Sequence, residues 1–155
     1  MAQKNFIRLD KLSKNAHYES IVSPTEELIN GHFVNLGTVI KTTEGEAVTF
    51  ELAEEGKSFD AIVVPVYLDK GHSDYKITED SVKPGKVARA ILPEKGAMFS
   101  INVELAPLVA KGDEVAVGVD GLGFKKAVDG EVVIGKCIDI NYYPFVGDLA
   151  VIRFA

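Results

Sequence analysis

Asp69, His72 and Asp74 are the side chains of this sequence that come nearest to a metal-binding group. All three lie in one polar segment, residues 69–86, whose role as a contact loop or as a solvated insertion the sequence leaves open. Their spacing lacks the Asp-x-Asp-x-Asp-Gly pattern with a distal glutamate that calcium loops use. Zinc would need more histidine or cysteine ligands. The sequence therefore predicts no metal site and no cofactor.

Gly121-Leu122-Gly123 begins like the glycine-rich loop of a dinucleotide-binding protein. The third glycine of that pattern is missing, because position 126 is lysine. The motif also lies between two strand-like segments, whereas phosphate-binding loops lead from a strand into the N-terminus of a helix. We interpret it as a structural turn.

Cysteine and histidine are scarce, with one Cys and three His in 155 residues. Cys137 follows Lys136, but adjacent residues of a strand point to opposite faces, so the lysine is not expected to activate the thiol. His17 and His32 stand alone, and no His–carboxylate dyad can be argued from their neighbours. No nucleophile, base and orienting group can be assembled from these spacings, and we predict that the chain is not an enzyme.

Two groups of residues are better suited to binding than to catalysis. Phe6, Ile7, Arg8 and Leu9 lie in a mildly basic N-terminal segment; we expect Phe6 and Leu9 to anchor a contact and Arg8 to pair with a carboxylate. The second group is the aromatic cluster Tyr142, Tyr143 and Phe145. It is typical of a packed corner or an interface anchor, and a stacking platform for sugar is the alternative.

The body that must position these groups has the composition of an all-β protein. Val and Ile total 31 residues against 11 Leu, and side chains branched at Cβ suit the pleated surface of a strand. We predict a single β-barrel or β-sandwich domain over residues 31–155. The expected strands are 33–40, 47–52, 61–68, 87–92, 98–105, 115–119, 122–127, 132–140 and 149–154.

Two hairpins are expected in the C-terminal third. Asp120-Gly121 and Asp129-Gly130 separate apolar runs, and Asp-Gly suits the positive φ angles of a type I′ turn. The sequence thus predicts a three-stranded meander there. Residues 87–92 and 98–105 are expected to pair across a turn at 93–96.

Residues 1–30 are predicted to form an extended arm with one short helical turn. Ser23-Pro24-Thr25-Glu26 is a capping box with proline at the first helical position, and Gly31 can end the helix. No nearby segment completes a sheet with residues 6–9. We expect the arm to reach a neighbouring subunit, and a chain without residues 1–20 to remain folded.

Charge and hydropathy exclude several classes of function. The net charge is −6, which disfavours a nucleic-acid surface. Residues 1–20 carry four basic and two acidic side chains, a net of +2, so the remainder carries −6 − 2 = −8. A single cysteine excludes an internal disulfide, no secretory signal is recognisable, and no apolar run approaches the length of a membrane span.

The C-terminal 45 residues resemble the head decoration, or capsid cement, proteins of tailed bacteriophages. The resemblance depends on Gly31-x-Phe33-Val34 at the start of the body and on a C-terminal series of turn and strand residues. That series is Lys111-Gly112-Asp113-x-Val115-x-Val117, Asp120-Gly121, Gly135 and Gly147-Asp148 before Leu149-Ala150-Val151.

This resemblance implies a non-enzymatic virion protein, often trimeric and assembled in the host cytoplasm. Such a protein binds the major capsid protein on the outer capsid surface and bridges neighbouring capsid subunits. Phe6, Ile7, Arg8 and Leu9 would then be the capsid contacts. Two alternatives remain open: a tail or neck component of a virion, and a carbohydrate-binding β-sandwich that uses Tyr142, Tyr143 and Phe145.

Overall fold

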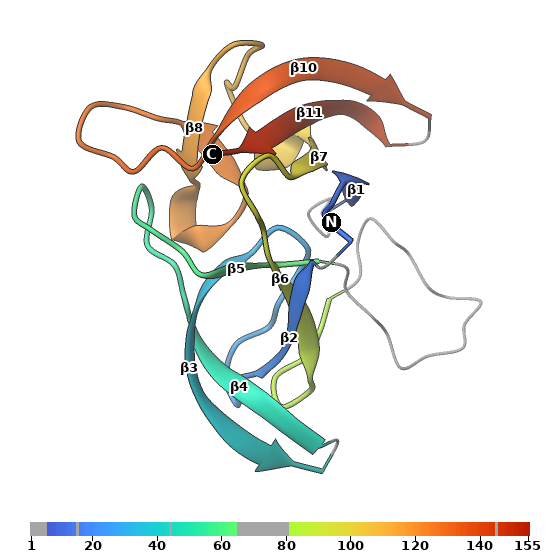
Figure 1. The fold of residues 1–155 in the computed structure, drawn as a ribbon, viewed down its shortest axis with the longest axis vertical. Helices are drawn as coiled ribbons and strands as arrows, with labels where there is room; N and C mark the ends of the chain where they lie inside the picture. The colour runs from blue at the N-terminus through green and yellow to red at the C-terminus, as the bar shows by residue number, and fades with distance from the viewer. Residues whose placement is uncertain (1–5, 15, 44, 65–80, 145) are drawn as a thin grey trace.

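The regular secondary structure of the described residues is almost entirely β-strand, as predicted. The structure, a computed structural model, describes residues 6–14, 16–43, 45–64, 81–144 and 146–155 (Figure 1). The strands in chain order are β1 Ile7–Lys11, β2 His17–Val22, β3 Phe33–Thr42, β4 Gly45–Leu52, β5 Ala61–Val63, β6 Ala88–Leu92, β7 Met98–Asn102, β8 Glu114–Val117, β9 Phe124–Lys126, β10 Gly135–Tyr143 and β11 Gly147–Phe154. Two 3₁₀ turns, η1 Val103–Leu105 and η2 Val119–Gly121, supply the helical residues of the described chain.

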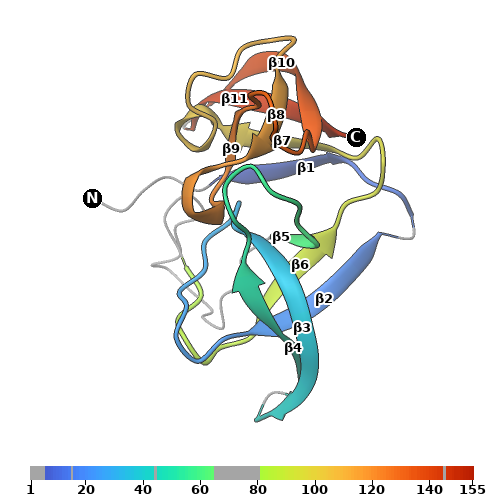
Figure 2. The same ribbon diagram turned by 90° about the vertical axis from the view of Figure 1, so that its left-hand side faces the viewer.

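The strands form a barrel and a separate sheet. The closed barrel has the order β2-β4-β3-β5-β6, and the six-stranded sheet has the order β1-β7-β11-β10-β8-β9. Figure 2 shows the sheet stacked above the barrel, with the chain crossing from β6 to β7. The predicted pairing of residues 87–92 with 98–105 is wrong, because β6 pairs with β2 and β5 while β7 pairs with β1 and β11.

Alternation along the strands divides the apolar side chains between two cores. In the barrel, Val34 and Val63 belong to a core with Ile21 and Phe50. Their strand neighbours Phe33 and Ile62 belong instead to a larger core shared with the six-stranded sheet, which supplies Phe99, Phe124 and Phe154. Phe33 meets Phe124 edge-on with ring centroids 5.3 Å apart. Burying both sets of side chains holds the sheet against the barrel.

The extended arm predicted for residues 1–30 is wrong for the part that the structure describes. β1 is an edge strand of the six-stranded sheet, antiparallel to β7. β2 pairs antiparallel with β6 and parallel with β4, and so closes the barrel. Ile21 is fully buried. Both strands find their partners far along the chain, which a search of neighbouring residues does not reveal.

The helical turn predicted for residues 23–30 is also absent. Ser23 Oγ accepts the backbone N–H groups of Thr25 and Glu26, both at 3.2 Å, as a helix-capping serine would. The chain nevertheless leaves the helical path, because buried Leu28 exchanges two backbone hydrogen bonds with Val82 at 2.8 and 3.0 Å. The local cap forms, and a long-range strand-like bridge replaces the helix.

The three-stranded meander predicted for the C-terminal third has a different strand order. β8 lies between β9 and β10, with Val117 opposite Phe124 and Val115 opposite Gly135. Asp120 and Gly121 have φ angles of 57° and 73°, so the first Asp-Gly pair has the positive angles expected. The second Asp-Gly pair, Asp129-Gly130, does not lead into a strand that pairs with β9. The strand that follows it, β10, pairs instead with the other edge of β8.

The barrel and the sheet are joined by backbone hydrogen bonds around His32. Gly123 donates to the carbonyl of Gly31 at 2.9 Å, and Gly56 donates to Val117 at 3.0 Å. His32 pairs with Leu122 across this junction. Its Nδ1 accepts the N–H of Ile29 at 3.0 Å, and burial lowers the pKa of His32 to about 4.

The stability of the protein should therefore fall in acid through His32. The folded pKa lies below the unfolded value of 6.5, so below pH 6.5 the unfolded chain binds a proton that the folded chain excludes. We expect a loss of about 3 kcal/mol between pH 7 and pH 4, measured by urea unfolding. His32→Gln should lose this component, whereas exposed His17→Gln should keep it. Equal pH dependence in both variants would contradict the assignment.

Candidate interaction surface

The tip of the β10–β11 hairpin and the beginning of β1 bring together the two groups of residues predicted to bind. The strand order β1-β7-β11-β10 places them on one sheet, and Figure 1 shows the hairpin passing above β1. Phe6 stacks on Tyr143, with ring centroids 5.4 Å apart and an interplanar angle of 24°. The guanidinium carbon of Arg8 lies 5.3 Å from the centre of the same ring.

Alternation along β1 explains which of its side chains reach this surface. Ile7 and Leu9 pack against the core shared by barrel and sheet. Phe6, Arg8 and Asp10 occupy the alternate positions, which face away from that core. Leu9, expected to anchor a partner, is thus used within its own chain.

Phe6 is the buried member of this group of side chains. It is 7% exposed and forms a small apolar cluster with Val146 and Leu149. The Phe6 ring is therefore covered by the chain itself. It contributes to the surface by stacking on Tyr143 and holding that ring in position. The predicted roles of Phe6, Ile7, Arg8 and Leu9 as capsid contacts stay predictions.

Arg8 is held in place by polar contacts as well as by the ring. Its Nε donates to Asp10 Oδ1 at 2.5 Å, and its Nη2 donates to Ser100 Oγ at 3.3 Å. The Ser100 hydroxyl in turn donates to the second oxygen of Asp10. The carboxylate that we expected on a partner is thus supplied by Asp10. The Arg8 side chain keeps 38% of its surface exposed, so an additional acceptor can approach it.

Tyr142 and Tyr143 place two exposed aromatic side chains at the end of β10. Tyr142 is 74% exposed and Tyr143 is 37% exposed. They are adjacent on β10 and so project to opposite faces of the hairpin. Phe145, the third aromatic of the predicted cluster, lies outside the described residues. We define the aromatic–arginine surface as Phe6, Arg8 and Tyr143, which contact one another; Tyr142 lies on the opposite face of the hairpin.

A chemically similar pair occurs elsewhere on the molecule. The guanidinium carbon of Arg89 on β6 lies 5.7 Å from the ring centre of Tyr18 on β2. Tyr18 is 38% exposed, much as Tyr143 is. The sequence alone does not point to this second pair. It provides a matched control for the pair of Arg8 and Tyr143.

The side chains that came nearest to a metal-binding group, Asp69, His72 and Asp74, lie outside the described residues. Among the residues that are described, no three His, Cys, Asp or Glu side chains are grouped as metal ligands would be. His17 Nε2 lies 2.7 Å from Glu19 Oε1, so the sequence reasoning missed a carboxylate two positions away, which faces the same side of the strand.

Cys137 is buried, and burial raises the pKa of its thiol. No helical segment found in the described ranges could serve as a transmembrane span.

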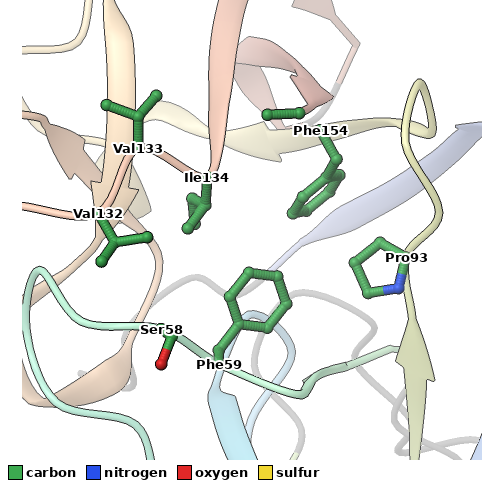
Figure 3. A pocket seen from close by; sticks show the side chains of 8 residues that line it. Ser58, Phe59, Pro93, Val132, Val133, Ile134 and Phe154 are labelled. Carbon is green, nitrogen blue, oxygen red and sulfur yellow. The ribbon is translucent and has the colours of Figure 1, made fainter.

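A shallow pocket lies where the barrel meets the C-terminal strand. It encloses about 220 Å³ and is lined by Ser58, Phe59, Pro93, Val132, Val133, Ile134, Phe154 and Ala155 (Figure 3). The rings of Phe59 and Phe154 lie 6.1 Å apart across it. Its volume is below the roughly 300 Å³ at which small-molecule sites begin. Its side chains offer one hydroxyl, from Ser58, and no acid or base.

The sequence matches no protein-family model and no curated protein. Among solved structures, the fold is similar to the N base of the head fiber protein gp8.5 of bacteriophage phi29. The two chains share 12% sequence identity and superpose with a TM-score of 0.54, over 90% of this chain and 94% of the other. The likeness thus extends over barrel and sheet together, and what it shows is a common fold.

Proposed function

We propose that this chain is a structural component of a phage virion, which binds the outer surface of the capsid and bridges neighbouring copies of the major capsid protein. The observation that carries the proposal is the fold shared with the base of a phage head fiber over nearly the whole of both chains. The resemblance of residues 111–155 to capsid cement proteins agrees with it.

The aromatic–arginine surface is the contact that we propose for the capsid. Aromatic and arginine side chains are enriched at the centres of protein interfaces. Here Arg8 is already fixed by Asp10 and by the ring of Tyr143, so little side-chain entropy is lost when a partner binds. Tyr143, which is 37% exposed, adds apolar area beside it.

The charge of the chain suits an external position. With a net charge of −6, the protein is repelled by packaged nucleic acid rather than attracted to it. We propose that it assembles on the head in the host cytoplasm without a nucleic-acid or membrane partner. Repeated copies on a symmetric shell would convert a modest affinity for each site into firm attachment.

The environment of the tyrosines distinguishes a carbohydrate-binding module from a protein-binding one. A carbohydrate-binding module would offer ring faces to a sugar, but one face of Tyr143 is already stacked on Phe6. This contact favours a protein partner.

A tail or neck component would carry the same fold, and microscopy of particles with the protein labelled distinguishes it from a head component.

Replacing Tyr143 by alanine should weaken capsid binding about 30-fold, or by about 2 kcal/mol, as for a central interface aromatic. The measurement is co-sedimentation of the full-length protein with intact capsids over a concentration series. Tyr18→Ala is the matched control, because it removes an exposed tyrosine beside an arginine on the barrel, and its binding should be unchanged.

Equal binding by the Tyr143 and Tyr18 variants would exclude the aromatic–arginine surface as the contact. Absence of binding by the unaltered protein would refute attachment to the capsid. Tyr142-dependent binding on a glycan array would instead support the carbohydrate alternative.

A further inference from the structure

A glycine follows Asn or Asp at three positions of the sequence: Asn30-Gly31, Asp120-Gly121 and Asp129-Gly130. Glycine has no Cβ, so its backbone nitrogen can approach the side-chain carbonyl carbon of the preceding residue without hindrance. Attack of this nitrogen on that carbon closes a five-membered succinimide ring. Ring closure requires that the glycine N–H is not held in a hydrogen bond and that the peptide can rotate. The structure meets both conditions at one of the three sites.

The Asn30-Gly31 site is protected by burial at the junction of barrel and sheet. Asn30 is 4% exposed, and the N–H of Gly31 donates to the carbonyl of Val63 at 3.0 Å. Gly31 also lies in a close contact, because a Cβ there would approach Cδ1 of Ile101 to 3.1 Å. The Gly31 nitrogen can therefore react only after this region opens.

The Asp120-Gly121 site is protected in the same way. Gly121 is buried, and its N–H donates to the carbonyl of Gly118 at 3.1 Å. A Cβ on Gly121 would lie 2.6 Å from the carbonyl oxygen of Ala53. The barrel backbone therefore leaves no space for a rotated peptide at this site.

The Asp129-Gly130 site has neither form of protection. Both residues are exposed in the loop between β9 and β10, which projects from the side of the molecule (Figure 1). None of the hydrogen bonds found among the described residues uses the N–H of Gly130, and a Cβ there would meet no atom within 4 Å. The turn is closed by its outer residues, since the N–H of Glu131 donates to the Val128 carbonyl at 3.1 Å. The peptide between Asp129 and Gly130 is thus free to rotate.

We propose that Asp129 is the site of a spontaneous backbone modification, its conversion to isoaspartate. The nitrogen of Gly130 attacks the side-chain carboxyl carbon of Asp129. A C–N bond forms and a C–O bond breaks, and the carboxyl hydroxyl leaves as water together with the amide proton. Water then adds to the former main-chain carbonyl carbon and breaks the original peptide C–N bond, which leaves the chain connected through the side-chain carboxyl carbon. The reaction needs no oxidant, reductant or enzyme.

The modification alters a loop that is bound to the barrel. It adds one carbon to the main chain inside the turn that Val128 and Glu131 close. The Glu131 carboxylate accepts the N–H of Val128 at 3.0 Å and the ammonium of Lys125 at 2.9 Å, and the N–H of Val132 donates to the Gly56 carbonyl at 2.9 Å. The contact between Val128 and Glu131 should be lost first, because these residues enclose the added carbon. The inference concerns the isolated protein and does not depend on the proposed function.

Ageing of the folded full-length protein tests the assignment. After several weeks near neutral pH, peptide mapping with a protein isoaspartyl methyltransferase should find about tenfold more isoaspartate at Asp129 than at Asn30 and Asp120 together, since the latter two react only through local opening. The same incubation in concentrated urea is the control for intrinsic reactivity. All three sites should react there, because the hydrogen bonds that hold Gly31 and Gly121 are lost.

Asp129→Glu provides the matched variant. Its longer side chain would have to close a six-membered ring, which forms far more slowly, so the isoaspartate signal of the folded protein should fall to background. Asp120→Glu makes the same change at a protected site and should leave the signal at Asp129 unchanged. Equal amounts of isoaspartate at Asp120 and Asp129 in the folded protein would overturn the proposal. So would an unmodified Asp129 in a folded sample whose urea-treated counterpart has reacted.

Discussion

A chain without residues 1–20 is expected to lose cooperative folding. The truncation removes β1 from the six-stranded sheet and most of β2 from the barrel. It opens the barrel between β4 and β6 and exposes the core that Phe6, Ile7 and Leu9 cover. Domains of this size are stable by roughly 5–15 kcal/mol. Losing a barrel strand and three buried or half-buried apolar side chains should exceed that margin.

Thermal unfolding followed by circular dichroism measures this result. The truncated chain should show no sigmoidal transition, whereas full-length Arg8→Gln, which keeps both strands, should retain one. A cooperative transition at an unchanged temperature in the truncated chain would show that the two strands are dispensable. If the strands are required, truncation is no test of capsid binding, and point variants such as Tyr143→Ala are needed.

Gly123→Ala is expected to destabilise the protein by about 4 kcal/mol. Gly123 has a φ of 68°, where a side chain costs about 1–2 kcal/mol. An added Cβ would also collide with the backbone carbonyl oxygen of Leu105, which cannot move as a side-chain end could. Forced displacement of packed structure costs a further 1–3 kcal/mol, on the order of an overpacked core. The N–H of Gly123 also carries one of the hydrogen bonds that join sheet and barrel.

Gly130→Ala separates the two contributions. Gly130 has a φ of 87°, and a Cβ there would meet no atom within 4 Å. This control should therefore lose only the backbone contribution, about 1–2 kcal/mol. Urea unfolding of both variants gives the comparison. Equal losses would mean that the junction at Leu105 adapts to the extra carbon and does not constrain the fold.

The aromatic–arginine surface shows how far the sequence could lead to a site. Phe6 and Arg8 stand out in one segment and Tyr143 in another, each by residue type. Their contact depends on β7 and β11 lying between β1 and β10, and Arg8 and Ser100 are 92 positions apart. Local reasoning also assigned Arg8 to a partner's carboxylate, although Asp10 lies two positions away on the same face of the strand.

Residue type sufficed for the fold class and for most of the strands. The excess of β-branched residues predicted an all-β protein, and the strand expected at 98–105 contains β7, whose Phe99 and Ile101 are buried in the core. Asp120-Gly121 was recognisable as a turn with positive φ angles, because few other residue pairs adopt them. These properties depend on sterics within a few residues, so they can be read directly from the chain.

Strand pairing was decided by the tertiary structure. Ser23 forms the cap that its motif predicts, yet the helix is replaced by the bridge between Leu28 and Val82. β1 and β2 were interpreted as an arm because their partners lie in remote segments. Any exposed strand edge can accept any other, and burial of side chains from the whole chain selects the pairing. Local sterics fix which residues become strands, whereas that global burial fixes where each strand lies.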